Sequence, residues 1–268
     1  MSLAEAEQSL KQGELQTALK LLQDQIRVDA ANPKLRVFLF QLLCVLGQWE
    51  RALAQLDVAA TLDASALAMA QMYGQAVRCE VLRSQVFEGK KTPMVLGEPE
   101  EWLALLIEAL LVAGQGRFAD AESLRGRAFE AAEPTAGSID GQAFAWIADA
   151  DCRLGPVCEA IINGRYYWVP FCRLRRVVVD APEDLRDLVW MPAHFEFEDG
   201  GEAVALIPTR YPGSDASDDV RIVMARSTSW SEVAPGNYHG LGQRLLSTDG
   251  GEKAIMDVRE ILLGAAGT

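Results

Sequence analysis

A repeat of 34 residues is the feature of this sequence that most limits its fold. The segment GELQTALKLL begins at Gly13 and aligns with GQWERALAQL, which begins at Gly47, so that Ala18 falls on Ala52. A period of 34 residues, with glycine between two helices and a small residue where the helices approach closely, is typical of tetratricopeptide repeats. The pattern therefore predicts antiparallel helix pairs stacked side by side.

The repeat continues in degenerate form. A third copy, GRFADAESLR, begins at Gly116, 69 residues after Gly47. Between these copies, residues 64–89 have helical apolar spacing without the glycine, and KKTPMVLGEP then interrupts the helices with two prolines and a glycine. Residues 1–134 are therefore predicted to form an all-α, tetratricopeptide-like repeat domain.

The predicted array offers a groove, because stacked units expose a concave surface lined by the first helix of each pair. The helix expected over 102–113 is apolar almost all round, which indicates that it is covered on two sides. Either neighbouring helices of the same chain cover it, or an amphipathic helix of a partner does. With core packing as the alternative for each, the groove-facing positions in a tetratricopeptide register are Val37, Gln41, Cys44, Leu103, Leu106 and Leu110.

From residue 156 onward the hydrophobic pattern alternates and predicts sheet. Asn163-Gly164 and Gly200-Gly201 mark tight turns between aromatic and β-branched runs. Further strands are expected in RRVVVD, VRIVMAR, GQRLLSTD and KAIMDV. Many short strands with tight turns favour a small antiparallel β barrel or sandwich over residues 156–268. Residues 135–155 are predicted to be a linker and a connecting helix, QAFAWIADADCR, so the chain as a whole is α+β and multidomain.

The run GRYYWVPF, followed by CRLRR, places aromatic rings beside arginines and allows a nucleic-acid platform, an active-site wall or a sheet strand. In a strand, Tyr166 and Trp168 share one face, and Tyr167 and Val169 share the other. Pro170 confines the end of such a strand to an edge or a bulge. Cross-strand packing accounts for the rings, whereas an RNA-binding adaptor requires them to be exposed.

Charge and composition exclude several classes of protein. The formal net charge is −13, and acidic residues outnumber basic ones in both halves, which disfavours nucleic-acid binding. The first residues lack the pattern of an export signal, and the apolar run WLALLIEALLVAG is too short to span a bilayer. Five cysteines without a CxxC pair indicate buried thiols in a reducing compartment. We expect a cytoplasmic protein with no nucleic-acid or membrane partner.

No catalytic motif is evident. HExxH, GxSxG and P-loop patterns are absent, and GLGQRLLSTDGG lacks the strand-then-helix frame of a dinucleotide site, so no cofactor or metal is expected. His239 lies in a turn-rich segment. The alternative function is a small-molecule-binding or hydrolytic enzyme with a site between the domains, built from Asp149, Asp151 or His194. A ligand-shaped cavity beside a carboxylate of shifted pKa would support that alternative.

Four segments resemble one family in order along the chain. They are DCRLGPVCEAIINGRYYWVPFCRLRRV, DLRDLVWMPAHFEF, ALIPTRYPGS and GLGQRLLSTDGG, and they resemble the C-terminal domain of the ImpE/TagJ (SciE-type) accessory proteins of the bacterial type VI secretion system. The repeat-like first half fits the same family. The resemblance implies a non-enzymatic adaptor that binds the N-terminal helix of the small sheath subunit, TssB, and is linked to ClpV, the AAA+ ATPase that recycles the contracted sheath.

The resemblance and the apolar helix together predict that residues 1–134 receive an amphipathic helix. The sheet has three candidate partners, which are ClpV, the sheath and a second copy of the chain in a homo-oligomer. Four arginines are candidates for contact with an acidic surface, although pairing with nearby acids such as those of DAPEDLRDL is the alternative. These four arginines are Arg173, Arg175, Arg176 and Arg186.

Overall fold

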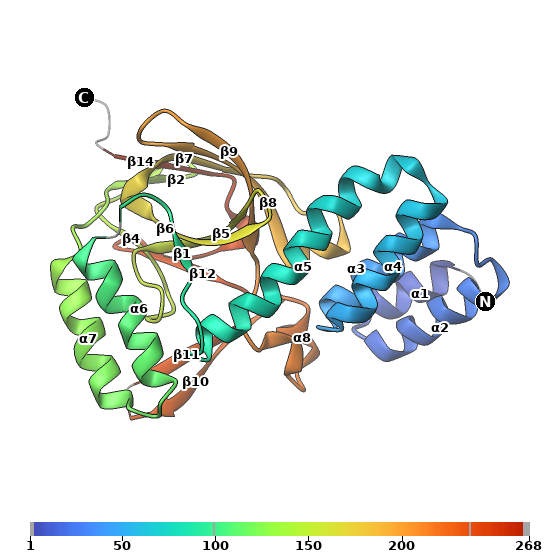
Figure 1. Cartoon of the computed structure of the whole chain (residues 1–268), viewed down its shortest axis with the longest axis horizontal. Coiled ribbons are helices and arrows are strands. Elements are labelled where there is room, and N and C mark those ends of the chain that lie inside the picture. The colour runs from blue at the N-terminus through green and yellow to red at the C-terminus, as the bar shows by residue number, and fades with distance from the viewer. Residues whose placement is uncertain (1–2, 99, 236, 265–268) are drawn as a thin grey trace.

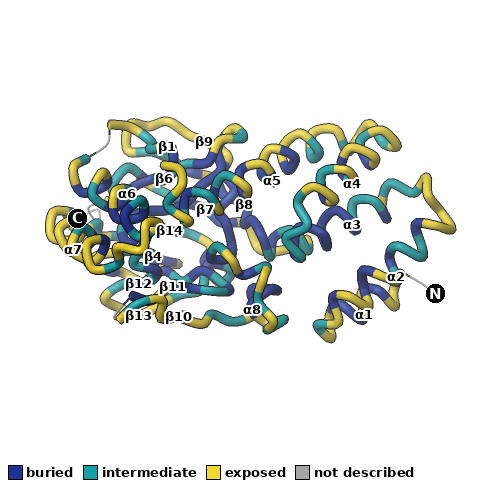
Figure 2. Tube along the Cα trace, turned by 60° about the horizontal axis from the view of Figure 1, so that its bottom comes forward, coloured by how far each residue is buried: buried dark blue, intermediate teal, exposed yellow. Residues whose placement is uncertain are grey.

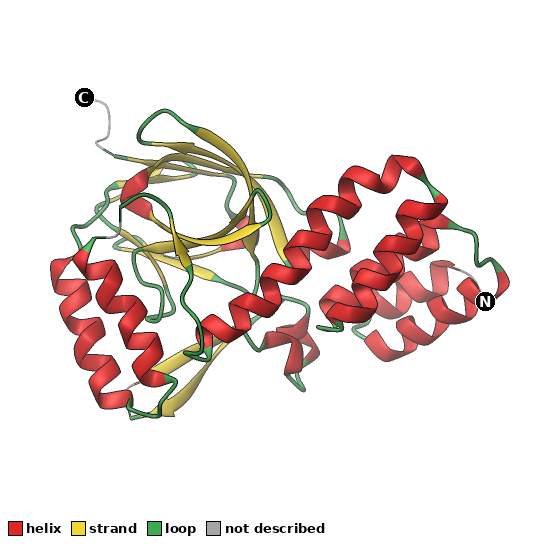
Figure 3. Ribbon diagram, viewed as in Figure 1, coloured by secondary structure: helices red, strands yellow, loops and turns green. Residues whose placement is uncertain are grey.

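The computed structural model describes residues 3–98, 100–235 and 237–264. In the view of Figure 1, the first four helices lie stacked at one end of the molecule, the fifth extends from them toward the other end, and the sheet and a second helix pair occupy that other end. Figure 3 shows the strands lying between these two groups of helices. The first five helices are α1 (Leu3–Lys11), α2 (Leu15–Val28), α3 (Pro33–Val45), α4 (Trp49–Leu62) and α5 (Leu67–Phe87).

The tetratricopeptide-like prediction is confirmed for this helical region. Helices α1 and α2 pack as one pair and α3 and α4 as the next. Asn32 starts α3 by accepting hydrogen bonds from the backbone N–H groups of Lys34 and Leu35, and Pro33 occupies the first turn. Gly47, between α3 and α4, has a φ of 66°, a conformation that few other residues adopt without strain.

The degenerate region and the third copy depart from the regular stack. Residues 67–87 form one long helix, α5, which packs against α4 and extends across the sheet (Figure 1). The third copy forms a separate helical hairpin, α6 (Glu101–Ala113) and α7 (Phe118–Ala131), at the far end of the molecule from α1 to α4. Residues 94–95, between α5 and α6, form β1 (Met94–Val95), which pairs in parallel with a strand of the sheet.

The second half is rich in sheet, as predicted. A nine-stranded sheet has the order β1-β6-β5-β9-β8-β7-β14-β2-β3, and smaller sheets are formed by β10-β11 and by β13-β12-β4. Both predicted turns join neighbouring antiparallel strands. The strands of the large sheet after β1 are β2 (Gly137–Ile139), β3 (Gln142–Phe144), β5 (Val157–Ile162), β6 (Arg165–Pro170), β7 (Leu174–Val179), β8 (Trp190–Phe197), β9 (Glu202–Pro208) and β14 (Glu260–Leu263). The others are β4 (Ile147–Asp149), β10 (Thr228–Ala234), β11 (Asn237–Gly242), β12 (Leu245–Thr248) and β13 (Gly251–Ala254).

The large sheet is open, so the predicted closed barrel or sandwich is not confirmed. Among the described strands, β1 and β3 are its two edges and do not pair with each other. One face of β6 carries Tyr166 and Trp168, which share a core with α3, α5 and α6, as the alternation in the sequence predicts. The other face carries Val169, which packs in a second core with strands of both larger sheets. Figure 2 shows buried residues running from the helices into the sheet without a break.

The prediction of a connecting helix over 142–153 was wrong. Residues 142–144 and 147–149 are the strands β3 and β4. The carboxylate of Asp149 accepts the N–H of Asp151, and that of Asp151 accepts the N–H of Arg153. Such local bonds compete with the hydrogen bonds of a helix. The backbone hydrogen bonds are made instead by strand pairing, of β3 with β2 and of β4 with β12.

Two further segments differ from the sequence-based expectation. VRIVMAR forms a short helix, α8 (Val220–Val223), because Asp219 caps its first turn by accepting the N–H of Arg221. The turn-rich segment around His239 forms the hairpin of β10 and β11, whose strand pattern is obscured in the sequence by proline and glycine. In KAIMDV, only the first two residues belong to β13, and η5 (Ile255–Asp257) follows.

The close approach of two glycines should make the docking of α6 sensitive to a single methyl group. A Cβ added to Gly114 would lie 2.4 Å from the carbonyl oxygen of Glu88 and 2.8 Å from Cα of Gly89, and neither backbone atom can move away freely. We expect Gly114→Ala to lower the free energy of unfolding by about 1–3 kcal/mol, measured by urea denaturation. Gly126→Ala in α7 is the matched control, since nothing lies within 4 Å of its added Cβ. The control should be stabilised by about 0.5–1 kcal/mol, and equal behaviour of the two variants would contradict the packing described.

Candidate functional site

A groove of about 860 Å³ lies against the first helices of the repeat units. Residues of α1, α3 and the start of α5 line it, and residues 182–188 together with Met224 and Arg226 of the sheet region complete it. Two turns of α-helix, about 10 Å across and about 11 Å long, occupy roughly the same volume. The groove is therefore large enough for about two turns of a bound helix.

The lining of this groove is amphipathic. Its apolar residues include Val37 and Phe38 on α3 and Met69 on α5, all of which are partly exposed. Charged side chains of both signs accompany them, as expected for a surface that receives a helix with one apolar and one polar face. The charged residues are Glu7, Lys11, Lys34, Asp63, Glu183, Asp184 and Arg226.

The structure divides the six predicted groove residues into two groups. Val37 and Gln41 line the groove, one turn apart on α3. Cys44 follows on the same face of α3 but is fully buried at the end of the helix. Burial raises the pKa of the Cys44 thiol well above its usual value, so it behaves as a small apolar core residue.

The three leucines of α6 lie elsewhere. Leu103 and Leu106 are 0% exposed and Leu110 is 3% exposed, and all three belong to the core shared by the helices and the sheet. They do not line the groove, because α6 is covered by α7 and by the same chain's sheet. The apolar pattern of α6 therefore reports burial within the chain.

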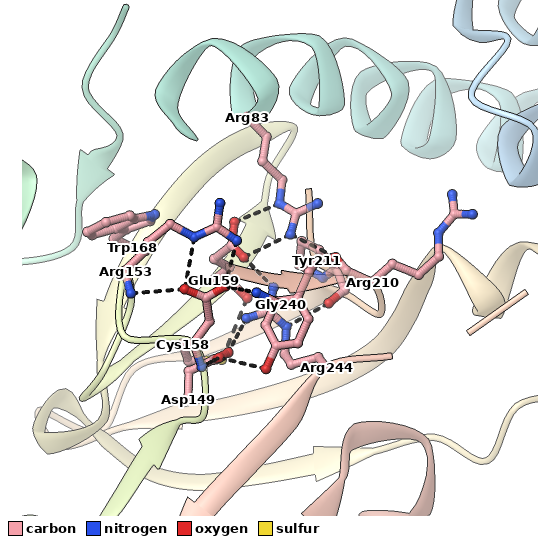
Figure 4. A network of polar contacts seen from close by, with 12 residues as sticks. Arg83, Asp149, Arg153, Cys158, Glu159, Trp168, Arg210, Tyr211, Gly240 and Arg244 are labelled. Atoms are coloured by element: carbon pink, nitrogen blue, oxygen red, sulfur yellow. Dashed lines mark hydrogen bonds and ion pairs between the residues drawn. The ribbon is translucent and has the colours of Figure 1, made fainter. Parts of the chain in front are cut away.

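A buried ion network joins the repeat helices to the sheet (Figure 4). Arg83 on α5 binds Glu159 on β5 through two bonds, Nε to Oε1 at 2.7 Å and Nη2 to Oε2 at 2.9 Å. Arg244 also binds Glu159, and on its other side it binds Asp149. The hydroxyl of Tyr166 donates to Glu159 and accepts a bond of 2.8 Å from the indole N–H of Trp168.

A second branch of the network connects Arg83 to Glu80 on α5 and to the end of α3. Arg83 Nη1 lies 3.2 Å from Glu80 Oε2, and the indole N–H of Trp190 donates to Glu80 at 2.9 Å. Arg83 also donates to the carbonyl oxygen of Arg210 at 2.8 Å. The buried guanidinium of Arg210 in turn donates to the carbonyl oxygens of Cys44, Val45 and Val223. This cation therefore caps the C-terminal end of α3, where carbonyl groups are left without helical partners.

Two of the network carboxylates, Glu159 and Asp149, have opposite pKa shifts. Burial opposes ionisation of Glu159, but Arg83 and Arg244 outweigh it and lower the pKa to about 2. Burial raises the pKa of Asp149 to about 6 against the attraction of Arg244, and the nearby charge of Asp151 adds to the rise. Glu159 is therefore the anion that holds the two arginines together at neutral pH.

The alternative enzyme site is only partly assembled, because Asp149 and Asp151 are neighbours whereas His194 does not line the depression beside Asp149. Asp149 borders a depression of about 420 Å³ beside Phe129 and Trp146. Its carboxylate is 1% exposed and turned inward, where Tyr211, Arg244 and a backbone N–H bind its oxygens. Asp151 is held by Arg153 and by the N–H of Gly240. Burial, with the neighbouring charge of Asp151, accounts for the raised pKa of Asp149 without a substrate.

The two histidines and the aromatic rings of β6 are accounted for by contacts within the chain. His194 projects from the sheet with a side chain that is 45% exposed, and its Nε2 lies 3.3 Å from Glu202 Oε2. His239 is half-buried in β11, where burial and then the charge of Arg153 lower its pKa to about 4. Tyr166 and Trp168 are 1% and 0% exposed, so they form no platform for stacking bases.

Three of the four candidate arginines bind carboxylates of their own chain. Arg173 pairs with Glu100, Arg176 with both Glu196 and Glu260, and Arg186 with Asp184. Arg175 is exposed on β7. Over residues 3–98, 100–235 and 237–264, no cluster of three or more His, Cys, Asp or Glu side chains could hold a metal ion. None of the helices described combines the length and apolarity needed to cross a bilayer.

Sequence reasoning missed the residues of the sheet region that complete the groove. Residues 182–188 fold around η3 (Leu185–Leu188), which packs against α3, and Met224 and Arg226 follow α8. The short apolar spacing in DLRDLV was a signal for a buried turn, but nothing in the sequence indicated which helix it would meet.

Comparisons with known proteins identify one family in each half of the chain. A family described as ImpE protein matches residues 141–262, and a tetratricopeptide repeat family matches residues 9–75. A relative from Pseudomonas aeruginosa, the type VI secretion system accessory component TagJ, is 50% identical over 256 residues, which are 96% of this chain and 90% of the relative. The crystal structure of protein VPA1032 from Vibrio parahaemolyticus superposes with a TM-score of 0.88 at 25% identity and covers 98% of each chain.

The depressed pKa of Glu159 predicts acid-sensitive stability. The carboxylate is ionised in the folded protein down to about pH 2, but in an unfolded chain only above about pH 4.3. Its contribution to the free energy of unfolding is therefore complete above about pH 4.3. It is lost as the pH falls from about 4.5 toward 2, and it amounts to about 3 kcal/mol. Denaturant titrations from pH 7 to 3 should show Glu159→Gln to be less stable at pH 7 and to lose less stability on acidification than the unmodified protein.

The matched control is Glu130→Gln, an exposed glutamate on α7. Its stability should follow that of the unmodified chain at every pH. Asp149, with its raised pKa, has the opposite sign: it costs stability as the pH rises from about 4, where it ionises in an unfolded chain, to about 6, where it ionises in the folded protein. Parallel acid profiles for Glu159→Gln and the unmodified chain would contradict the prediction.

Proposed function

The chain belongs to the ImpE/TagJ family, and we propose that it is a non-enzymatic accessory component of a type VI secretion system that binds the N-terminal helix of the small sheath subunit, TssB. Its 50% identity to the accessory component TagJ extends over 96% of the chain and supports the general role. The helix-binding role is supported by the groove along α1, α3 and α5.

The groove is the observation that carries the proposal. Its volume of about 860 Å³ suits two helical turns, and its apolar residues lie on the first helices of three consecutive units. Val37 and Phe38 on α3 would pack against the apolar face of the partner helix, and the charged residues of the rim would meet its polar flanks. Val37 and Gln41 remain the groove residues of this proposal, whereas the buried leucines of α6 have no part in it.

A link to the recycling ATPase ClpV is the second part of the proposal. It would use a surface outside the groove, so that sheath and ATPase are held at the same time in the cytoplasm. The exposed Arg175 on β7 is available to an acidic partner, since Arg173, Arg176 and Arg186 already bind carboxylates of the chain. Retention of ClpV by the immobilised full chain, with and without the sheath peptide, tests this part. No retention in either state would contradict it.

Calorimetric titration of the full chain with a peptide of the TssB N-terminal helix tests the groove. We expect saturable binding that Val37→Asp weakens about tenfold or more, because a buried carboxylate in the apolar floor would lose its hydration without gaining a partner. The full chain is needed because the helical region shares its core with the sheet.

The matched control is Val58→Asp. Val58 is a 37% exposed valine on α4, the second helix of the same unit, and it does not line the groove. Both variants should retain the helical circular dichroism of the unmodified chain, and the control should bind the peptide normally. Equal binding by the two variants would place the partner helix elsewhere, and no binding by the unmodified chain would refute the helix-binding role.

A further inference from the structure

The groove is built by both halves of the chain. One side is formed by a loop between β7 and β8, residues 182–188, which we call the wall segment. Leu185 and Leu188 of the wall segment are only partly buried, although each packs against the shared core. Met224, which follows α8, also belongs to the groove lining but is only 3% exposed. A partner in the groove would thus meet apolar side chains from the sheet region as well as from the repeat helices.

The wall segment is held firmly in place. The buried carboxylate of Asp187 accepts the backbone N–H groups of Glu183 at 2.8 Å and Asp184 at 2.7 Å. The hydroxyl of Thr209, at the end of β9, donates to the carbonyl oxygen of Asp187 at 2.6 Å. Arg186 lies over the ring of Tyr73 on α5, 4.5 Å from its centroid. These contacts fix the loop to both the sheet and the helices, so its leucines have defined positions.

Cations from the sheet region also hold the ends of the groove helices. Arg210 binds carbonyl groups at the C-terminal end of α3, and the guanidinium of Arg226 approaches the carbonyl oxygens of Leu10 and Lys11 at the end of α1. A positive charge is favoured at this end of a helix, where the backbone dipole is negative. The distance between the wall segment and the repeat helices is therefore set within the folded chain, before any partner binds.

We propose that the wall segment contacts the bound partner helix directly and is a determinant of partner specificity, with Leu185 and Leu188 receiving apolar side chains of that helix. This inference rests on the helix-binding function proposed above. It assigns to the sheet region a role in forming the binding site itself, so the repeat helices alone supply an incomplete site.

The charge around the wall segment indicates the chemistry of the occupant. Glu183 is exposed at the rim, whereas Asp184 is paired with Arg186. Lys11, Lys34 and Arg226 also lie at the groove and nearly balance its carboxylates, so the negative potential comes mainly from the net charge of −13 over the whole surface. A helix whose apolar face is flanked by basic residues is therefore the favoured partner, because complementary charge speeds encounter and excludes acidic competitors.

Matched leucine variants of the full chain test the inference by calorimetric titration with the TssB peptide. Leu185→Gln should weaken binding about fivefold or more, because it replaces an apolar contact in the wall segment. The control is Leu82→Gln on α5, another partly buried leucine that packs against the same core but does not line the groove. Glu183→Lys should weaken binding further and reduce its dependence on salt. Normal affinity in Leu185→Gln and Glu183→Lys would overturn the inference.

A second experiment uses the unmodified chain and so does not depend on the folding of a variant. Peptides carrying a photo-reactive leucine at one apolar position at a time are crosslinked to the full chain, and the sites are mapped by mass spectrometry. At least one peptide should label residues 182–188. Labelling confined to α1, α3 and α5 would overturn the role of the wall segment while leaving the proposed function intact, and absence of binding by every peptide would overturn both.

Discussion

The ionised carboxylate of Glu159 is the interaction on which the arrangement of this molecule depends. It lies at the point where α5 crosses the sheet, and it binds Arg83 from the helices and Arg244 from the sheet region. A charge without access to water is tolerated only when its partners satisfy it, and removing one partner leaves the others buried and unpaired. Such a network adds little stability over an apolar core, but it permits few alternative positions for α5.

The consequence of this fixed crossing is that the two halves form one folding unit. Trp168 and Trp190 of the sheet share a core with Phe40 and Tyr73 of the helices, and Arg210 binds the last carbonyl groups of α3. In an ordinary helical repeat array, each unit contacts only its neighbours and the array can flex. Here arginines of the sheet region bind the carbonyl ends of α1 and α3, which restricts movement of the helices that line the groove.

The sequence predicted local structure well wherever a pattern repeats over a short distance. The 34-residue period located α2 and α4, and Asn163-Gly164 located the hairpin of β5 and β6. The sequence could not show that α6 would lie apart from the helical stack. An all-round apolar pattern is the same whether a helix is covered by its own chain or by a partner. The helix predicted over 142–153 was wrong for a different reason. Asp149 and Asp151 accept nearby backbone N–H groups, and these bonds compete with helical hydrogen bonds in a way that composition does not reveal. The wall segment was beyond prediction since its contact with α3 joins residues far apart in the chain.

A preformed groove also determines how a short contact can be useful. Three apolar side chains on two turns of helix would contribute about 5–9 kcal/mol if fully buried, at about 1.5–3 kcal/mol each. Ordering a flexible helix costs about 2–5 kcal/mol, which leaves about 0–7 kcal/mol and so a dissociation constant no lower than about 10 µM. A groove that also had to assemble on binding would lose even this margin. The arginines that bind α1, α3 and α5 thus reduce the receptor's share of the ordering cost, and they allow a contact of two helical turns to be both specific and readily reversible.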